Sequence, residues 1–141
     1  MSNLQRFTEY AEAFEETLLD DDWVRLEQYF SPDAVYLPGD GNEATGRESV
    51  LQTLRDSVNS LDRKFDSREF AEEPIVTEVG DTVTFAFKVK YTKDGLPDLM
   101  IFGTERASFA NGVIERMEDF LDEHAAAEMA DWLEKHQQSL G

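Results

Sequence analysis

The chain has 141 residues, of which 40% are hydrophobic, so it is long enough to bury a core and too apolar for an intrinsically disordered chain. Its formal net charge of −18 argues against binding to nucleic acid or to anionic lipid. It contains no cysteine, which excludes disulfides, thiolate chemistry and Cys-ligated metal sites.

The first half of the chain predicts three helices and one short strand. A capping box formed by Ser2 and Gln5 begins an amphipathic helix over residues 3–19. One residue of the acidic triplet 20–22 is expected to cap a second, short helix, which Pro32 stops. Residues 34–37 predict a short strand, and a second capping box, Thr45 to Glu48, is expected to begin a third helix.

The second half predicts a run of antiparallel strands followed by a helix. Residues 63–78 are extended, and strict alternation predicts a half-buried strand over residues 82–91. Residues 99–109 and 113–122 form a hairpin around Asn111-Gly112, a dipeptide typical of tight turns between strands. A last helix reaches about Gln138. Helices segregated from a strand meander indicate an α+β fold, with helices on one face of a curved antiparallel sheet.

No linker, repeat or low-complexity segment divides the chain, so residues 1–141 are expected to form a single domain with 123–139 as a C-terminal helical extension. The beginning of the chain lacks the apolar segment of a secretory signal, and no apolar run is long enough to span a membrane. These features predict a cytoplasmic protein that does not bind membranes.

Four motifs, in this order, resemble the nuclear transport factor 2-like superfamily, in particular its SnoaL-like and ketosteroid-isomerase-like branch. They are residues 29–35 (YFSPDAV), 46–48 (GRE), 80–83 (GDTV) and 111–114 (NGVI) with the acidic segment 118–122 (EDFLD). The resemblance covers roughly residues 7–122. It implies a cone in which a bent sheet wraps a pocket that the helices close. Because this fold carries many activities, the resemblance does not specify one.

The catalytic residues of ketosteroid isomerases match this sequence poorly. No carboxylate precedes Pro38, where the resemblance would place a base, and the position of the family's helix tyrosine falls near Phe14 and Glu15, with Tyr10 about one turn earlier. Only Glu105 stands where the isomerases have a protonated acid. Steroid isomerase activity is therefore not expected.

SnoaL-type cyclases place an aspartate base near the end of the last strand, which implies Asp122 or Asp119 as the base here. A carboxyl in an apolar pocket has a raised pKa and becomes a useful proton acceptor. Asp122 could instead cap the last helix, where it would be a poor base, and the cap is the favoured interpretation. Asp119 and Glu105 are then the better candidates if their side chains turn inward. Strand alternation places Asp119 and Asp122 on opposite faces, but a bulge would reverse this.

Aromatic side chains and one arginine are the candidates for lining the pocket: Phe14, Trp23, Tyr36, Tyr91, Phe102, Arg106 and Phe120. Tyr36, Tyr91, Arg106 or His124 could donate a hydrogen bond to a developing enolate oxygen. The sequence has two isolated histidines without ligand spacing, no Gly-rich phosphate loop and no nucleophile elbow. We therefore expect neither a metal nor a cofactor.

The sequence leaves two functions open. One is a SnoaL-like pocket protein for a small hydrophobic or polyketide-like molecule, acting as an isomerase, cyclase or hydratase with a carboxylate base. The other is a non-catalytic ligand-binding or dimeric protein-interaction module. The resemblance also implies a homodimer formed through the outer face of the sheet. The last helix is expected either to lie back on its own domain as a lid or to pack on a second subunit.

Overall fold

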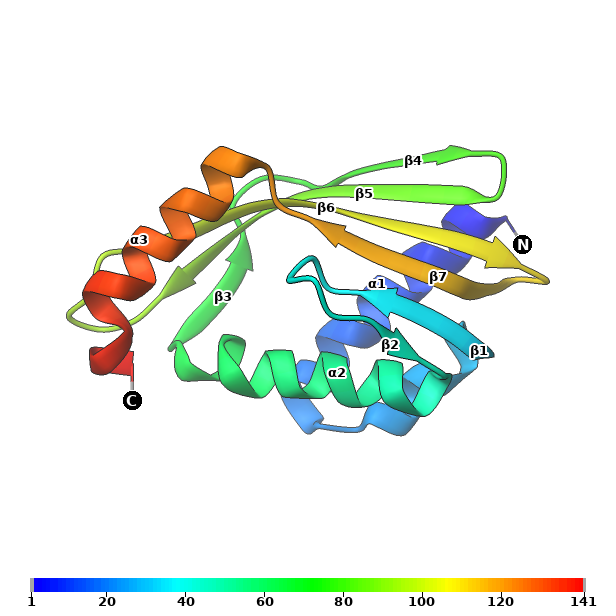
Figure 1. Cartoon of the computed structure of the whole chain (residues 1–141), viewed down its shortest axis with the longest axis horizontal. Coiled ribbons are helices and arrows are strands. Elements are labelled where there is room, and N and C mark those ends of the chain that lie inside the picture. The colour runs from blue at the N-terminus through cyan, green and yellow to red at the C-terminus, as the bar shows by residue number, and fades with distance from the viewer. Residues whose placement is uncertain (1, 141) are drawn as a thin grey trace.

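The structure is a computed structural model that describes residues 2–140, and it has the α+β architecture predicted from the sequence (Figure 1). A curved sheet arches over the helices α1 and α2, and α3 lies beside one end of the sheet, at the left of the view. The elements follow the chain as α1 (Asn3–Asp20), the 3-10 helix η1 (Trp23–Tyr29), β1 (Phe30–Leu37), β2 (Ala44–Thr45), α2 (Arg47–Ser60), η2 (Asp62–Lys64), β3 (Ser67–Phe70), β4 (Ile75–Val79), β5 (Thr82–Thr92), β6 (Leu99–Ala110), β7 (Val113–Phe120) and α3 (Glu123–Leu140).

The sheet has the strand order β2-β1-β7-β6-β5-β3, and β4 also pairs with β5. The pairs formed by β3 to β7 are antiparallel, but β1 pairs with β7 in parallel. The sheet is therefore mixed, whereas the sequence predicted a purely antiparallel one. The first strand of the chain lies beside the last, so that Tyr36 is the register partner of Met117.

Helix α1 begins as predicted. The Ser2 hydroxyl accepts a hydrogen bond from the Gln5 backbone, and the Gln5 side chain accepts one from the Ser2 backbone, which completes the capping box. The helix buries Phe7, Tyr10 and Ala13 against the sheet. This buried face places Tyr10 within the main core cluster.

Two predicted caps are wrong. Helix α2 has Gly46 as its N-cap, with φ at 95° and no side-chain cap, so Thr45 and Glu48 form no capping box. No side chain of the acidic triplet caps η1 either. Instead, Asp20 accepts hydrogen bonds from Arg25, and Asp21 accepts one from the indole of Trp23. These acids are occupied by nearby side-chain donors and not by the free N–H groups of the helix.

Pro32 lies inside β1 and does not end the preceding helix, which stops at Tyr29. The proline falls where the pairing between β1 and β7 is irregular, between Phe30 and Val35. Because regular pairing is interrupted there, the missing N–H of proline removes no ladder hydrogen bond. The strand therefore begins at Phe30 and is longer than predicted.

The hairpin of β6 and β7 turns at Asn111 and Gly112, which both have positive φ, 54° and 79°. These values match the type of turn that suits the twist of a hairpin. The register shifts between Ser108 and Phe109, close to the turn. Beyond this irregularity the register is regular and sets Glu105 directly opposite Asp119.

Helix α3 packs on its own sheet and extends to Leu140, slightly beyond the predicted end. The indole of Trp132 donates a hydrogen bond to the backbone oxygen of Pro97, 3.1 Å away, and its ring packs against Phe65. A second core cluster forms there, separate from the main cluster under α1 and α2. None of the helices in residues 2–140 combines the length and the apolar character needed to cross a membrane.

Candidate functional site

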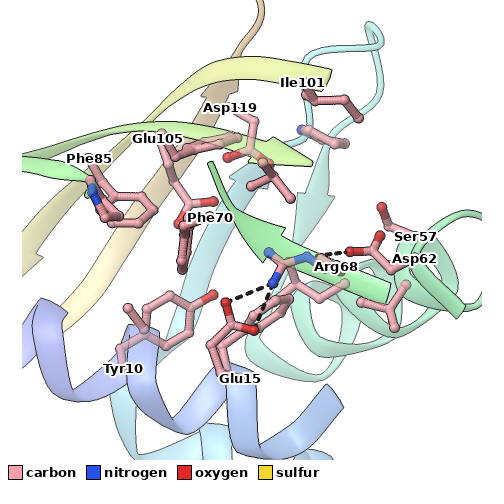
Figure 2. Close-up of a pocket in the computed structure, with 18 of the residues that line it drawn as sticks. Tyr10, Glu15, Ser57, Asp62, Arg68, Phe70, Phe85, Ile101, Glu105 and Asp119 are labelled. Carbon is pink, nitrogen blue, oxygen red and sulfur yellow. Dashed lines mark hydrogen bonds and ion pairs between the residues drawn. The ribbon is translucent and has the colours of Figure 1, made fainter. Parts of the chain in front are cut away.

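A cavity of about 610 Å³ lies under the curved sheet and borders both core clusters. Side chains from α1, α2, β1, β3, β5, β6, β7 and α3 line it (Figure 2). Most of them are apolar, among them Phe7, Phe14, Val58, Phe85, Phe87 and Ile101. A cavity of this size is within the range of small-molecule sites.

Glu105 on β6 and Asp119 on β7 are register partners, and both line the cavity. Their side chains extend from neighbouring strands into the same space (Figure 2). The two carboxyl groups are close enough that the charge of Asp119 raises the pKa of Glu105, which favours a proton on one of them. The chain therefore holds a carboxyl pair deep inside the fold, and both members stay accessible from the cavity.

Tyr36 on β1 donates a hydrogen bond from its hydroxyl to Oδ2 of Asp119. This contact depends on the parallel pairing of β1 with β7, which brings the first strand beside the last. The other oxygen, Oδ1 of Asp119, is buried and accepts no hydrogen bond from an N–H or hydroxyl group of residues 2–140. Because buried acceptors are rarely left without a donor, this oxygen favours a protonated neighbour, and Glu105 is the register partner of Asp119.

The environment raises the pKa of both carboxyls. Burial raises the pKa of Glu105 well above its ordinary value, and the nearby charge of Asp119 raises it further. Burial also raises the pKa of Asp119, but the hydrogen bonds from Glu105 and Tyr36 oppose that rise. Because these hydrogen bonds stabilise a charged Asp119, Glu105 is the member that holds the proton and Asp119 is the carboxylate.

Tyr10 on α1 brings a second hydroxyl to this end of the cavity (Figure 2). Burial raises the pKa of Tyr10 well above its ordinary value, and the charges of Glu105 and Asp119 add to the rise. Burial likewise raises the pKa of Tyr36. Both phenols therefore stay protonated and can act as hydrogen-bond donors.

A second polar cluster is centred on Arg68 of β3. Its Nη1 lies 2.7 Å from both carboxylate oxygens of Glu15 on α1, and its Nε lies 3.0 Å from Oδ2 of Asp62. The hydroxyl of Tyr91 donates to the same Asp62 oxygen at 3.0 Å. Figure 2 shows these ion pairs beside the cavity, where Arg68 lies between Glu15 and Asp62. This cluster contains ions of opposite sign, whereas the carboxyl pair brings together two acids whose pKa values are raised.

The structure brings four of the seven predicted lining residues to the cavity: Phe14, Tyr36, Tyr91 and Phe120. Trp23 does not line it; its ring packs behind Phe14, with centroids 6.2 Å apart. Phe102 and Arg106 do not line it either, and the exposed ring of Phe102 lies under the ammonium group of Lys88. Strand alternation explains this result, because both residues are out of phase with the inward-facing Glu105.

The three candidate carboxyls occupy two different places. Glu105 and Asp119 face the cavity. Asp122 is exposed, lies outside the cavity lining, and accepts a hydrogen bond from the backbone N–H of Ala125 at 2.7 Å. This is the geometry of a helix N-cap, which the sequence offered as the alternative to a base. His124, also considered as a donor, is exposed and pairs with Glu128 at 2.9 Å.

Among the polar lining residues that sequence reasoning did not propose for the site are Tyr10, Glu15, Asp62 and Arg68. Tyr10 follows Phe7 by three positions on the apolar face of α1, a spacing that could have indicated an inward hydroxyl. The others carry no such signal, since Glu15, Asp62 and Arg68 come from separate elements that only the folded chain brings together. Within residues 2–140, no group of His, Asp and Glu side chains has the arrangement of a metal site.

No protein-family model matches this chain, and no curated protein matches it. Solved structures do share its fold. A nuclear transport factor 2-like protein of unknown function from Burkholderia pseudomallei is 19% identical, with a TM-score of 0.67 over 94% of this chain and 98% of that one. A candidate SnoaL-like polyketide cyclase from Shewanella denitrificans is 17% identical, with a TM-score of 0.64 over 91% of this chain and 96% of that one.

TerC, a protein crystallised with polyporic acid, is 17% identical to this chain, with a TM-score of 0.67. The match covers 94% of this chain and 99% of TerC. Structural likeness at such low sequence identity establishes the architecture, and the chemistry has to be argued from the residues of the site. The chain therefore has the nuclear transport factor 2-like fold, in the form found in SnoaL-like proteins, as the sequence resemblance predicted.

Proposed function

We propose that this protein binds an apolar small molecule in the cavity and moves a proton on it, with Asp119 as the base and Glu105 as the acid. The observation that carries the proposal is the carboxyl pair, in which Glu105 and Asp119 lie on neighbouring strands as register partners and both line an apolar cavity. Two carboxyls whose surroundings drive their protonation states apart are suited to acid–base work. The likeness to SnoaL-like polyketide cyclases supports the same class of substrate.

The chemistry follows from the positions of the groups. Asp119 takes a proton from a carbon next to a ligand carbonyl, and the electrons of that C–H bond move into the enolate. Glu105 donates its proton to the developing enolate oxygen, and the Tyr10 hydroxyl stabilises the same oxygen. In isomerisation, Asp119 returns its proton to another carbon of the enol, and Glu105 takes its proton back from the enol oxygen as the carbonyl re-forms. In ring closure, the enol carbon attacks a second carbonyl, Glu105 takes its proton back from the enol oxygen, and Asp119 gives its proton to the new alkoxide.

The first test measures the protonation of the carboxyl pair. Carbon NMR titration of the side-chain carboxyls should show Glu105 titrating above its ordinary pKa, and Tyr36→Phe should raise the apparent pKa of Asp119 because it removes one donor. If both carboxyls titrate at the values of free Glu and Asp, the acid–base proposal is wrong.

The second test measures proton transfer itself. Exchange of the α-protons of β-tetralone in deuterium oxide, followed by proton NMR, should be faster with the protein than in buffer. Asp119→Asn should slow this exchange by about 100-fold or more, the range for loss of a general base. Asp122→Asn is the matched control, because the same change is made at the exposed helix cap outside the cavity. Equal losses in the two variants would contradict the role of Asp119.

The alternative function is ligand binding without catalysis. It predicts that β-tetralone binds and that its α-protons exchange at the rate found in buffer. We also propose that the protein forms a homodimer through the outer face of the sheet, where the ring of Phe102 is 39% exposed and lies outside the cavity lining. Sedimentation equilibrium should then give twice the chain mass of 16.1 kDa, and Phe102→Asp should shift the protein to monomer.

A further inference from the structure

Arg68 has donor capacity left on the side of the cavity. Glu15 occupies Nη1, and Nε lies close to Asp62 but is buried without the geometry of a hydrogen bond to any described residue. Neither a hydrogen bond nor an ion pair joins Nη2 to a residue of 2–140 in the cluster of Figure 2. A guanidinium carries five N–H donors, so this arginine can still bind a ligand oxygen.

The charge of Arg68 is nevertheless fully compensated. Two carboxylates, Glu15 and Asp62, lie against a single guanidinium, so the cluster as a whole is negative. Arg68 is the one basic side chain among the described lining residues, whereas the acidic ones are Glu12, Glu15, Asp62, Glu73, Glu105 and Asp119. Glu12 and Glu73 are exposed at the rim. A ligand anion would therefore meet a negative field and no unpaired cation.

The remaining carboxylate adds to this effect. Asp119 is ionised, and its partners are the neutral hydroxyl of Tyr36 and the neighbouring carboxyl of Glu105, so it strengthens the negative field that an anion meets. An anion that leaves water for a cavity without an unpaired cation loses several kcal/mol of hydration, by general estimates. Neutral oxygens incur a much smaller loss on burial and can use the remaining donors of Arg68.

We propose that Arg68, held by Glu15 and Asp62, is a second polar anchor of the cavity and makes it selective for neutral over anionic ligands. Arg68 binds a carbonyl or hydroxyl oxygen of the ligand, while the carboxyl pair acts on the other polar end. Glu15 is the specificity-determining residue, because its bidentate contact neutralises the arginine. The inference rests on the proposed function for the location of the ligand, and it adds the ligand's charge class and second contact.

The test compares two ligands of one shape by isothermal titration calorimetry at neutral pH: β-naphthol, which is neutral, and β-naphthoate, which is an anion. The wild-type protein should bind β-naphthol at least about tenfold more tightly than β-naphthoate. Glu15→Gln frees part of the charge of Arg68 and should improve β-naphthoate relative to β-naphthol by about tenfold. Glu16→Gln is the matched control: it removes the same charge from the same helix, but Glu16 is exposed, lies outside the cavity lining and pairs with Arg25, so the ratio should change less than about twofold.

Several outcomes would overturn the proposal. They are failure of β-naphthol to bind, tighter binding of β-naphthoate by the wild-type protein, and equal shifts in Glu15→Gln and Glu16→Gln, which would indicate a general field effect. Because these measurements follow binding alone, they are independent of proton transfer. An intact preference for β-naphthol without α-proton exchange on β-tetralone would reject the catalytic proposal and keep this one.

Discussion

The cavity contains two polar clusters that solve the same physical problem in opposite ways. Around Arg68, buried charges are retained because ions of opposite sign lie within 3.0 Å of one another. At Glu105 and Asp119, two acidic side chains face each other, and the raised pKa of Glu105 keeps that carboxyl protonated. The first arrangement fixes charge in place, and the second creates a proton that can move. The comparison indicates that Arg68 positions a ligand and that the carboxyl pair reacts with it.

The largest expected difference between the clusters is in stability. Arg68→Leu leaves Glu15 and Asp62 facing each other without a cation, and it should lower the free energy of unfolding by about 3 kcal/mol, since loss of one partner of a buried ion pair is strongly destabilising. Glu105→Gln replaces a protonated carboxyl with a neutral amide of similar shape, so its effect should stay within about 1 kcal/mol.

Urea unfolding at neutral pH measures both free energies, with Glu15→Gln as a milder variant of the Arg68 cluster. Similar losses in Arg68→Leu and Glu105→Gln would mean that the two clusters do not differ in the way described. That result would indicate that Glu105 is ionised in the folded protein and that its charge is stabilised by other contacts.

The second difference is in pH dependence. Because the pKa of Glu105 is raised in the folded protein, the folded state holds a proton that the unfolded chain releases near the ordinary value of 4.5. Stability from this group is complete below that pH and is lost as the pH rises through the folded pKa, with a slope of up to about 1.4 kcal/mol per pH unit. Thermal or urea unfolding from mildly acidic to neutral pH measures the slope.

Glu105→Gln should flatten this decline of the free energy of unfolding. Subtracting the curve of the variant from that of the wild type removes the general effect of the chain's net charge, which both proteins share. Asp20 changes stability in the opposite direction and in another window, because its hydrogen bond with Arg25 lowers its pKa from 3.8 to about 2. If the free energy of unfolding changes with pH in the same way for the wild type and Glu105→Gln, Glu105 has the same pKa in the folded and unfolded states, and the prediction is wrong.

The smallest effect is expected outside both clusters, at Asp122. Asp122→Ala removes the N-cap of α3 and should lower the free energy of unfolding by about 1 kcal/mol, as usual for a helix cap. Proton exchange on β-tetralone should stay unchanged. Asp122→Ser, which can still cap, should recover most of the stability. A loss of exchange without a loss of stability would return Asp122 to the list of candidate bases.

Local sequence signals predicted much of this fold. The capping box at Ser2, the alternation over 82–91 and the turn at Asn111-Gly112 all specify their elements through contacts between near neighbours. The cap predicted at Thr45 failed because a glycine with positive φ begins α2 instead. Pro32 was misread because the sequence does not show that β1 pairs irregularly at that point.

The order of the elements, the α+β class and the short set of carboxyls from which the site is built could all be predicted from the sequence. Periodicity and turn chemistry record these features in adjacent residues. The choice among the carboxyls depended on contacts that form when the chain folds. The register of β6 against β7 turned Glu105 and Asp119 inward together, the parallel pairing of β1 brought Tyr36 to Asp119, and the start of α3 assigned Asp122 to a cap. Burial and proximity decide which carboxyl holds a proton, and both arise from contacts between residues far apart in the chain.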